Sequence, residues 1–248
     1  MDEIFPYICV VKPLNNNVMI QHDEKRIGDY LIKTYYDESP DDPRSWDNFG
    51  KMICFHKTHK FLGDNHDYKS ENYSSWEDLR KEIESDYNVG VILPLYLYEH
   101  GGITMRTSPF GCSFDSGQVG WIFCTKEDMD SNWIELSGQE KEERCEVLLK
   151  GEVETYDQYL IGDVYGYKVF KVSTCNFGHE HEEELESCWG IFGDEECMTE
   201  GESVVKYLRN QDIKEWIKKE EPKQLTDLEI AIKLEEIERE DENLIGLS

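Results

Sequence analysis

Histidine and cysteine residues gather in two stretches of the sequence, and these residue types could bind a metal ion. The first stretch, CFHKTHKFLGDNH, contains Cys54, His56, His59 and His66. The second contains Cys175, His179, His181, Cys188 and Cys197. Structural zinc sites use four nitrogen or sulfur ligands at short, regular spacings between paired residues. Neither stretch has such spacings, so we expect no metal site and no cofactor.

Cys188 could serve as a nucleophile, with His56 and His100 as bases. A catalytic cysteine needs a positive or base-bearing neighbourhood, whereas the residues around Cys188 are acidic. The polar turn at Asp115-Ser116 offers further reactive side chains, although a structural turn is the simpler interpretation. The chain has no G-x-S-x-G, P-loop or Rossmann glycine motif. We therefore expect no catalytic residues, and an enzyme is the alternative, with a site drawn from His56, His100, Asp115, Ser116 and Cys188.

The net charge of the protein is strongly negative. Its 248 residues include 26 Lys and Arg against 54 Asp and Glu, which gives a formal charge of −28. Such a surface repels phosphate backbones and anionic membrane surfaces. The charge predicts a basic partner and argues against direct nucleic-acid or membrane binding, although solubility alone also explains a high charge.

The acidic residues are densest between Val172 and Val205, where ten acids occur and no Lys or Arg. Carboxylates at that density can imitate the charge of a nucleic acid and speed association with a basic groove. A solvated acidic loop is the competing interpretation. The predicted partner-binding residues are Glu180, Glu182, Glu183, Glu184, Glu186, Asp194, Glu195 and Glu196.

The sequence also predicts a location. Its N-terminus opens with acids and lacks the basic region of a signal peptide. No apolar run approaches the roughly 20 residues of a membrane span. The eight cysteines are scattered, which is typical of reduced, buried thiols in a cytoplasm.

Local patterns predict an α+β fold, with a mostly antiparallel sheet, flanking helices and a helical C-terminal tail. We expect a globular domain over 1–200 and a charged helical extension over 201–248. Strands are predicted at 4–12, 17–21, 27–36, 51–56, 89–100, 119–125, 163–173 and 186–193, and helices at 74–88 and 140–160, with a last helix capped at Thr226 or Asp227. The stretch TCNFGHEHEEE is expected to be a loop or a disordered tip.

Several strings occur in an order that resembles a group of acidic accessory proteins encoded by bacteriophages and other mobile elements. They are Trp46-Asp47-Asn48, Cys54-Phe55-His56, Leu62-Gly63-Asp64, Leu93-Pro94-Leu95-Tyr96-Leu97-Tyr98, Thr107-Ser108-Pro109-Phe110, Asp115-Ser116-Gly117-Gln118-Val119-Gly120, Tyr156-Asp157-Gln158-Tyr159-Leu160, Gly162-Asp163-Val164-Tyr165-Gly166-Tyr167 and Ser187-Cys188-Trp189-Gly190. The resemblance covers roughly residues 30–195. It implies a setting, the cytoplasm of a bacterial host, and carries over no catalytic residue.

Many proteins in that setting block CRISPR, restriction or other host defences. We therefore expect a non-enzymatic inhibitor that binds a basic defence protein or ribonucleoprotein complex through its acidic surface. The helical tail predicts a capacity for self-association. The alternative is an enzyme that acts on a small signalling molecule or on a protein.

Overall fold

The structure is a computed structural model that describes residues 19–220. The strand predicted at 4–12, the first two residues of the strand predicted at 17–21, and the last helix predicted from Thr226 lie outside these residues, as does Cys9. Within the described residues, no helix is long and apolar enough to cross a membrane.

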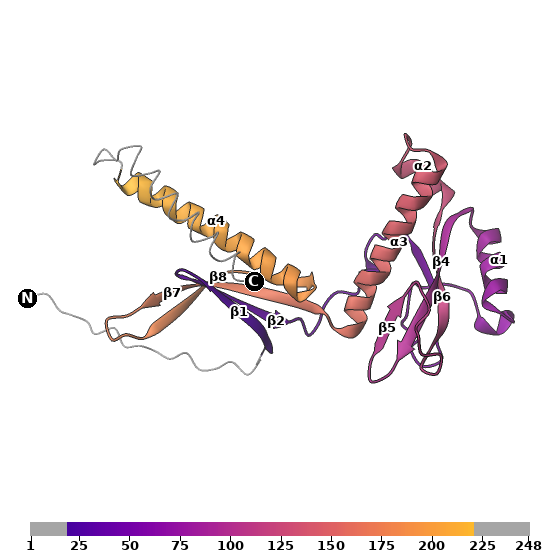
Figure 1. The fold of residues 1–248 in the computed structure, drawn as a ribbon, viewed down its shortest axis with the longest axis horizontal. Helices are drawn as coiled ribbons and strands as arrows, with labels where there is room; N and C mark the ends of the chain where they lie inside the picture. Colours follow the sequence, from indigo (N-terminus) through magenta and orange to yellow (C-terminus); the bar gives the residue numbers. More distant parts are fainter. Residues whose placement is uncertain (1–18, 221–248) are drawn as a thin grey trace, which may run out of the picture. The chain divides into compact units, whose positions relative to one another are not determined.

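Two antiparallel sheets and several helices form the predicted α+β fold (Figure 1). One sheet has the order β1-β2-β7-β8 and the other the order β3-β6-β4-β5. The strands are β1 (Gln21–Ile27), β2 (Tyr30–Tyr36), β3 (Lys51–Cys54), β4 (Val89–Glu99), β5 (Ile103–Arg106), β6 (Ser116–Thr125), β7 (Val164–Thr174) and β8 (Glu180–Phe192). The helices are α1 (Trp76–Asp86), α2 (Lys126–Asn132), α3 (Gly138–Ile161) and α4 (Asp194–Glu220), with short 3-10 turns at Pro43–Ser45 and Ser70–Asn72.

Strand β6 is buried on both faces of its sheet. Its side chains alternate between the faces, as in any strand. Ile122 and Cys124 join the cluster that contains Leu149 of α3, whereas Trp121 and Phe123 join the cluster that contains Ile83 of α1. Figure 1 accordingly shows α3 and α1 on opposite sides of this sheet. The sheet is therefore the middle layer of a helix–sheet–helix arrangement.

Capping residues set the ends of the two long helices that cover this sheet. Ser75 caps α1 by accepting a hydrogen bond from the Asp78 backbone N–H. Ser137 and Glu140 form a reciprocal capping box at the start of α3. Helix α3 ends at Gly162, whose φ of 77° lies in the left-handed region that glycine adopts most readily. These local signals explain why both helices were predictable.

Two predictions about strands are wrong. The run 27–36 is not one strand, because Gly28 adopts a φ of 59° and turns the chain between β1 and β2. The acidic stretch is not a loop, because β8 already begins at Glu180. The loop before it is short: the Cys175 backbone N–H donates to the His179 carbonyl, and Gly178 has a φ of 80°. Ion pairs to Arg26 and Lys168 offset part of the repulsion that a strand of glutamates would suffer.

The contacts between residues divide the chain into two compact units. The described part of the first comprises 19–23, 33–167 and 188–197, and that of the second comprises 24–32, 168–187 and 198–220. The boundaries cut β1, β2, β7, β8 and α4, and the predicted domain boundary at residue 200 also falls inside α4. In the second unit, α4 is held by Glu202, which pairs with Lys25, and by Asp212, which accepts hydrogen bonds from Tyr30 and Lys171.

Candidate functional site

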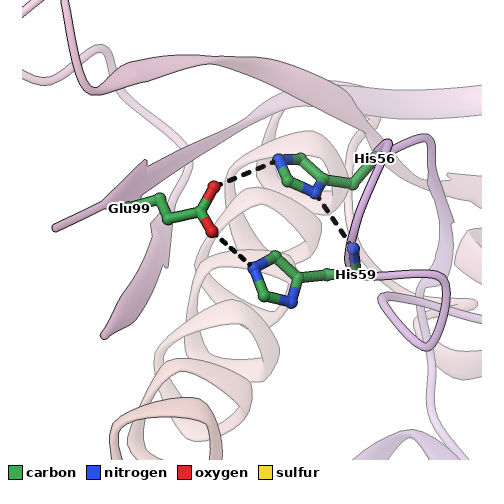
Figure 2. A group of neighbouring side chains, drawn as sticks. All are labelled: His56, His59 and Glu99. Atoms are coloured by element: carbon green, nitrogen blue, oxygen red, sulfur yellow. Dashed lines mark hydrogen bonds and ion pairs between the residues drawn. The ribbon is translucent and has the colours of Figure 1, made fainter. Parts of the chain in front are cut away.

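Two histidines and a glutamate meet beside the end of β4 (Figure 2). Glu99 is the last residue of β4, and His56 and His59 lie in the loop that follows β3. The His59 Nε2 atom lies 2.9 Å from Glu99 Oε1, and the His56 Nε2 atom lies 3.8 Å from Glu99 Oε2. One ligand atom from each residue falls within 4.8 Å of the others. The spacing of the histidines did not reveal this group, because Glu99 comes from another strand.

The hydrogen bonds of the His56 ring show which of its two nitrogens carries the proton, and so whether Nε2 has a free lone pair for a metal ion. The Nδ1 atom of His56 accepts the backbone N–H groups of Thr58 and His59, at 3.3 and 3.1 Å. A neutral ring whose Nδ1 accepts must carry its proton on Nε2, the atom that faces Glu99. A histidine that binds metal through Nε2 instead donates from Nδ1. In this conformation the three residues form a clamp in which the hydrogen bond between His59 and Glu99 joins the loop to β4, and the His56 ring lies 3.8 Å from the same carboxylate.

Burial lowers the pKa of one histidine of this clamp, His56. Desolvation lowers the pKa of His56, and the neighbouring His59 lowers it further. The two rings are stacked with their centroids 4.9 Å apart, so two positive charges there would repel each other. At neutral pH His56 is therefore uncharged, in agreement with its hydrogen bonds.

The alternative catalytic residues are only partly brought together. The His100 Nδ1 atom lies 3.4 Å from Asp115 Oδ2, and His100 follows Glu99 directly. The Ser116 hydroxyl donates to the Cys112 carbonyl, so it is not directed at His100. Cys188 lies in β8 of the other sheet, where its thiol faces the Trp189 carbonyl at 3.8 Å. Of the candidate residues, the structure thus pairs His100 with Asp115, while the Ser116 hydroxyl and the Cys188 thiol are directed at backbone carbonyls.

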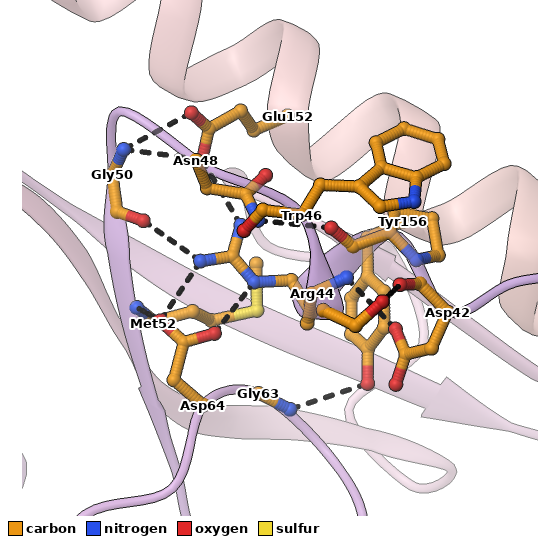
Figure 3. A network of polar contacts seen from close by, with 12 residues as sticks. Asp42, Arg44, Trp46, Asn48, Gly50, Met52, Gly63, Asp64, Glu152 and Tyr156 are labelled. Carbon is orange, nitrogen blue, oxygen red and sulfur yellow. Dashed lines mark hydrogen bonds and ion pairs between the residues drawn. The ribbon is translucent and has the colours of Figure 1, made fainter.

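A buried arginine lies at the centre of a polar network in the first unit (Figure 3). The Arg44 side chain is only 3% exposed. It donates two hydrogen bonds to Asp64, one to Glu152 and one to the Gly50 carbonyl. Burial alone lowers the pKa of Arg44, but the hydrogen bonds and charges of Asp64 and Glu152 more than offset this and raise it. The guanidinium stays charged and donates these four hydrogen bonds to two carboxylates and one carbonyl.

The carboxylates of this network also hold the backbone around them. Glu152 accepts the N–H groups of Phe49 and Gly50, and Asp64 accepts the N–H of Met52. The loop from Asp37 to Gly50 is thereby fixed to α3 and β3. The sequence analysis missed Arg44 because Pro40 and Pro43 marked this stretch as a plain loop. A single arginine in an acidic, proline-containing loop was the available signal.

The predicted partner-binding residues fall on two elements. Glu180, Glu182, Glu184 and Glu186 share one face of β8, Glu183 lies on the other face, and the remaining three form the first turn of α4. The Glu180 and Glu184 side chains are 55% and 44% exposed although they pair with Arg26 and Lys168. The acids at the start of α4 also stabilise the helix, because its N-terminus carries a partial positive charge.

The cysteines depart from the expectation of buried thiols. Cys54, Cys124, Cys145 and Cys197 are buried, whereas Cys112 and Cys188 are exposed and Cys175 is half-buried; all seven are free thiols. Burial raises the pKa of Cys54 and of Cys145 to about 12. A hydrogen bond with His181 lowers the pKa of Cys175 instead. The surroundings of Cys175 therefore favour the reactive thiolate, in contrast to those of Cys54 and Cys145.

Comparisons of the chain with protein-family models, with curated proteins and with solved structures found no match.

Proposed function

We propose that the protein is a phage or mobile-element inhibitor of a bacterial defence system of the CRISPR or restriction type. It binds a basic, nucleic-acid-handling protein or complex in the host cytoplasm. The observation that carries the proposal is the carboxylate face of β8, defined as Glu180, Glu182, Glu184 and Glu186. Glu180 pairs with Arg26 and Glu184 pairs with Lys168, yet these two carboxylate side chains stay 55% and 44% exposed.

The position of β8 in its sheet supports this proposal. Lys168 of β7 pairs with Glu184, whereas Lys171, on the opposite face of β7, pairs with Asp212 of α4. Within the described residues, the carboxylate face therefore points away from α4. Successive side chains on one face of a strand are about 6.6–6.8 Å apart. Phosphates of one DNA strand recur about every 3.4 Å along the axis, so the row is a regular line of negative charge at about half that density.

A structural role for these carboxylates is the competing explanation. β8 is an edge strand, and charged side chains on an edge strand prevent unwanted pairing with other chains. The two roles differ in their cellular consequences, because edge protection affects solubility and does not require a defence target.

A plating experiment tests the proposal. Bacteria that carry a defence system and express this protein are challenged with a phage which that system restricts, across a panel of CRISPR and restriction systems. Wild-type protein is expected to raise the efficiency of plating for at least one system. The variant Glu180→Gln, Glu182→Gln, Glu184→Gln and Glu186→Gln, which neutralises the whole carboxylate face, is expected to lose the effect while being expressed and soluble. Full protection by this variant would contradict the proposal.

The second candidate is an enzyme, and the His100–Asp115 pair beside the His56–His59–Glu99 clamp is the observation in its favour. The same assay separates the two. If His100→Asn or Asp115→Asn abolishes protection and the β8 variant keeps it, the enzyme is supported and the acidic surface is not.

Self-association through the C-terminal helices is a further proposal. Light scattering after size exclusion tests it, by comparing the whole chain with a chain that ends at residue 220. A monomer in both cases would contradict it.

A further inference from the structure

A second surface of the first unit combines aromatic rings with carboxylates around a cavity of about 320 Å³. This volume is near the lower end of the range for ligand pockets, about 300–1,000 Å³. Its walls include Trp46, Trp189 and Phe192 together with Asp37 and Asp41. The residues Trp46 and Trp189 are 48% and 39% exposed. Large aromatic residues left half-exposed beside carboxylates are typical of binding surfaces.

The carboxylate of Asp37 is fixed in place by backbone donors. Its Oδ1 atom accepts the Ser39 N–H at 3.0 Å, and its Oδ2 atom accepts the Gly190 N–H at 3.1 Å. Gly190 lines the cavity and has a φ of 76°, in the left-handed region that favours glycine. These bonds tie the loop after β2 to β8.

The aromatic walls are held in place as well. The Trp189 indole lies so close to Gly166 that an added Cβ atom there would lie 2.2 Å from its Cε3 atom. The rings of Trp46 and Phe192 meet edge to face, with centroids 5.6 Å apart. Trp46 follows Arg44 by two residues and is drawn beside the buried network in Figure 3. The cavity therefore has little freedom to collapse.

Asp41 supplies the second negative charge. It is exposed, lines the cavity, and has no hydrogen-bond partner among the described residues. Its two oxygens are thus available to a ligand with paired N–H donors. A guanidinium group offers such a planar pair and also stacks on aromatic faces.

We propose that this cavity binds a guanidinium group, which contacts the indoles of Trp46 and Trp189 and is neutralised by Asp37 and Asp41. The group belongs either to an arginine side chain of a protein or to a free arginine-like molecule. Cation–π attraction and ion pairing both act on the same ligand atoms, and exposed tryptophan is the best aromatic partner for a cation. The site does not depend on the proposed inhibition.

The test follows the indole N–H signals of the whole protein by nitrogen-15 NMR, assigned with Trp46→Phe and Trp189→Phe. The probes are N-acetyl-arginine amide, free arginine, and N-acetyl-citrulline amide as the neutral isostere. We expect the arginine amide to shift the Trp46 and Trp189 signals with a Kd on the order of 1 mM. The signal of Trp133, which packs against the core, is expected to stay in place.

Matched variants locate the binding. Trp46→Ala and Asp41→Asn are each expected to weaken binding roughly 2- to 30-fold. Asp47→Asn, an exposed acid of the same loop that does not line the cavity, is expected to have no effect. Equal or tighter binding of the blocked amide supports a protein arginine, whereas at least tenfold tighter binding of free arginine supports a small molecule. Unchanged Trp46 and Trp189 signals, equal binding of the citrulline amide, or equal effects of the two Asp variants would overturn the proposal.

Discussion

Arg44 and Asp64 meet through two parallel hydrogen bonds, from Nε to Oδ1 and from Nη2 to Oδ2, each 2.8 Å long. This bidentate geometry places a buried positive charge against a carboxylate that also holds the Met52 backbone. The pair therefore links the loop that carries Trp46 to β3. We expect its loss to lower the stability of the protein and to loosen the Trp46 wall of the cavity.

Arg44→Met is expected to lower the free energy of unfolding by about 3–5 kcal/mol, because it leaves Asp64 and Glu152 as uncompensated charges. The triple variant Arg44→Met, Asp64→Asn and Glu152→Gln removes all three charges and is expected to be less destabilised than Arg44→Met alone. Urea denaturation measures both. The control, Arg80→Met, breaks an exposed pair with Glu84 and should cost under about 1 kcal/mol. Equal losses for Arg44→Met and Arg80→Met would refute the role of the network.

Gly166→Ala is expected to displace the Trp189 indole, because the new Cβ atom has no room beside it. We expect a loss of about 1–3 kcal/mol in the free energy of unfolding and a changed Trp189 indole signal. Gly151→Ala is the matched control: Gly151 lies within α3 with open space around its Cα, and alanine there should stabilise the helix by about 0.8–1 kcal/mol. A Gly166→Ala protein as stable as wild type would show that Trp189 does not need this contact.

Iodoacetamide is expected to alkylate Cys175 at least about 1,000 times faster than Cys54 near pH 8, because burial leaves Cys54 almost entirely protonated. His181→Leu removes the hydrogen bond that lowers the pKa of Cys175 and should slow its reaction. Peptide mass spectrometry of the labelled protein reads both rates. Equal rates for Cys175 and Cys54, or an unchanged rate in the variant, would count against this environment.

The pH dependence of stability should contain a contribution from His56. Its pKa is lowered in the folded protein, chiefly by desolvation, so the unfolded chain takes up this proton more readily. Below the ordinary histidine pKa of about 6.5, stability therefore falls until the folded pKa is reached. His56→Asn keeps an acceptor for the backbone N–H groups without titrating. Urea midpoints at pH 7.5 and 5.5 should fall further for wild type than for this variant, and equal falls would contradict the assignment.

Local signals made much of the fold predictable, and long-range contacts made the rest unpredictable. The capping residue Ser75 and the helical spacing of Leu79 and Ile83 predict α1 from the sequence. The turn at Gly28 was missed because a single glycine between strand-forming residues is a weak signal. The strand at Glu180 was missed because glutamate disfavours strands, and its ion pairs with Arg26 come from residues far away in the chain.

The same distinction applies to the sites. The acidic residues of β8 are visible in the sequence because charge is a property of composition. Glu99 joins His56 and His59 only through the arrangement of the strands. The aromatic cavity joins Trp46 and Trp189 in the same way, across 143 positions of sequence, the difference between their residue numbers. No sequence spacing predicts that such a pair lies together, so these groups could be identified only from the structure.

The most direct test of the central claim is a quantitative pull-down from a bacterium whose defence system the protein inhibits. Wild type is compared with the β8 variant of four Glu→Gln changes and with a control of equal charge, Glu127→Gln, Glu142→Gln, Glu143→Gln and Glu154→Gln, which alters exposed acids of α2 and α3. We predict a basic defence protein at constant stoichiometry with wild type and control, released as salt rises, and absent with the β8 variant. Equal recovery of that protein with the β8 variant would contradict the account.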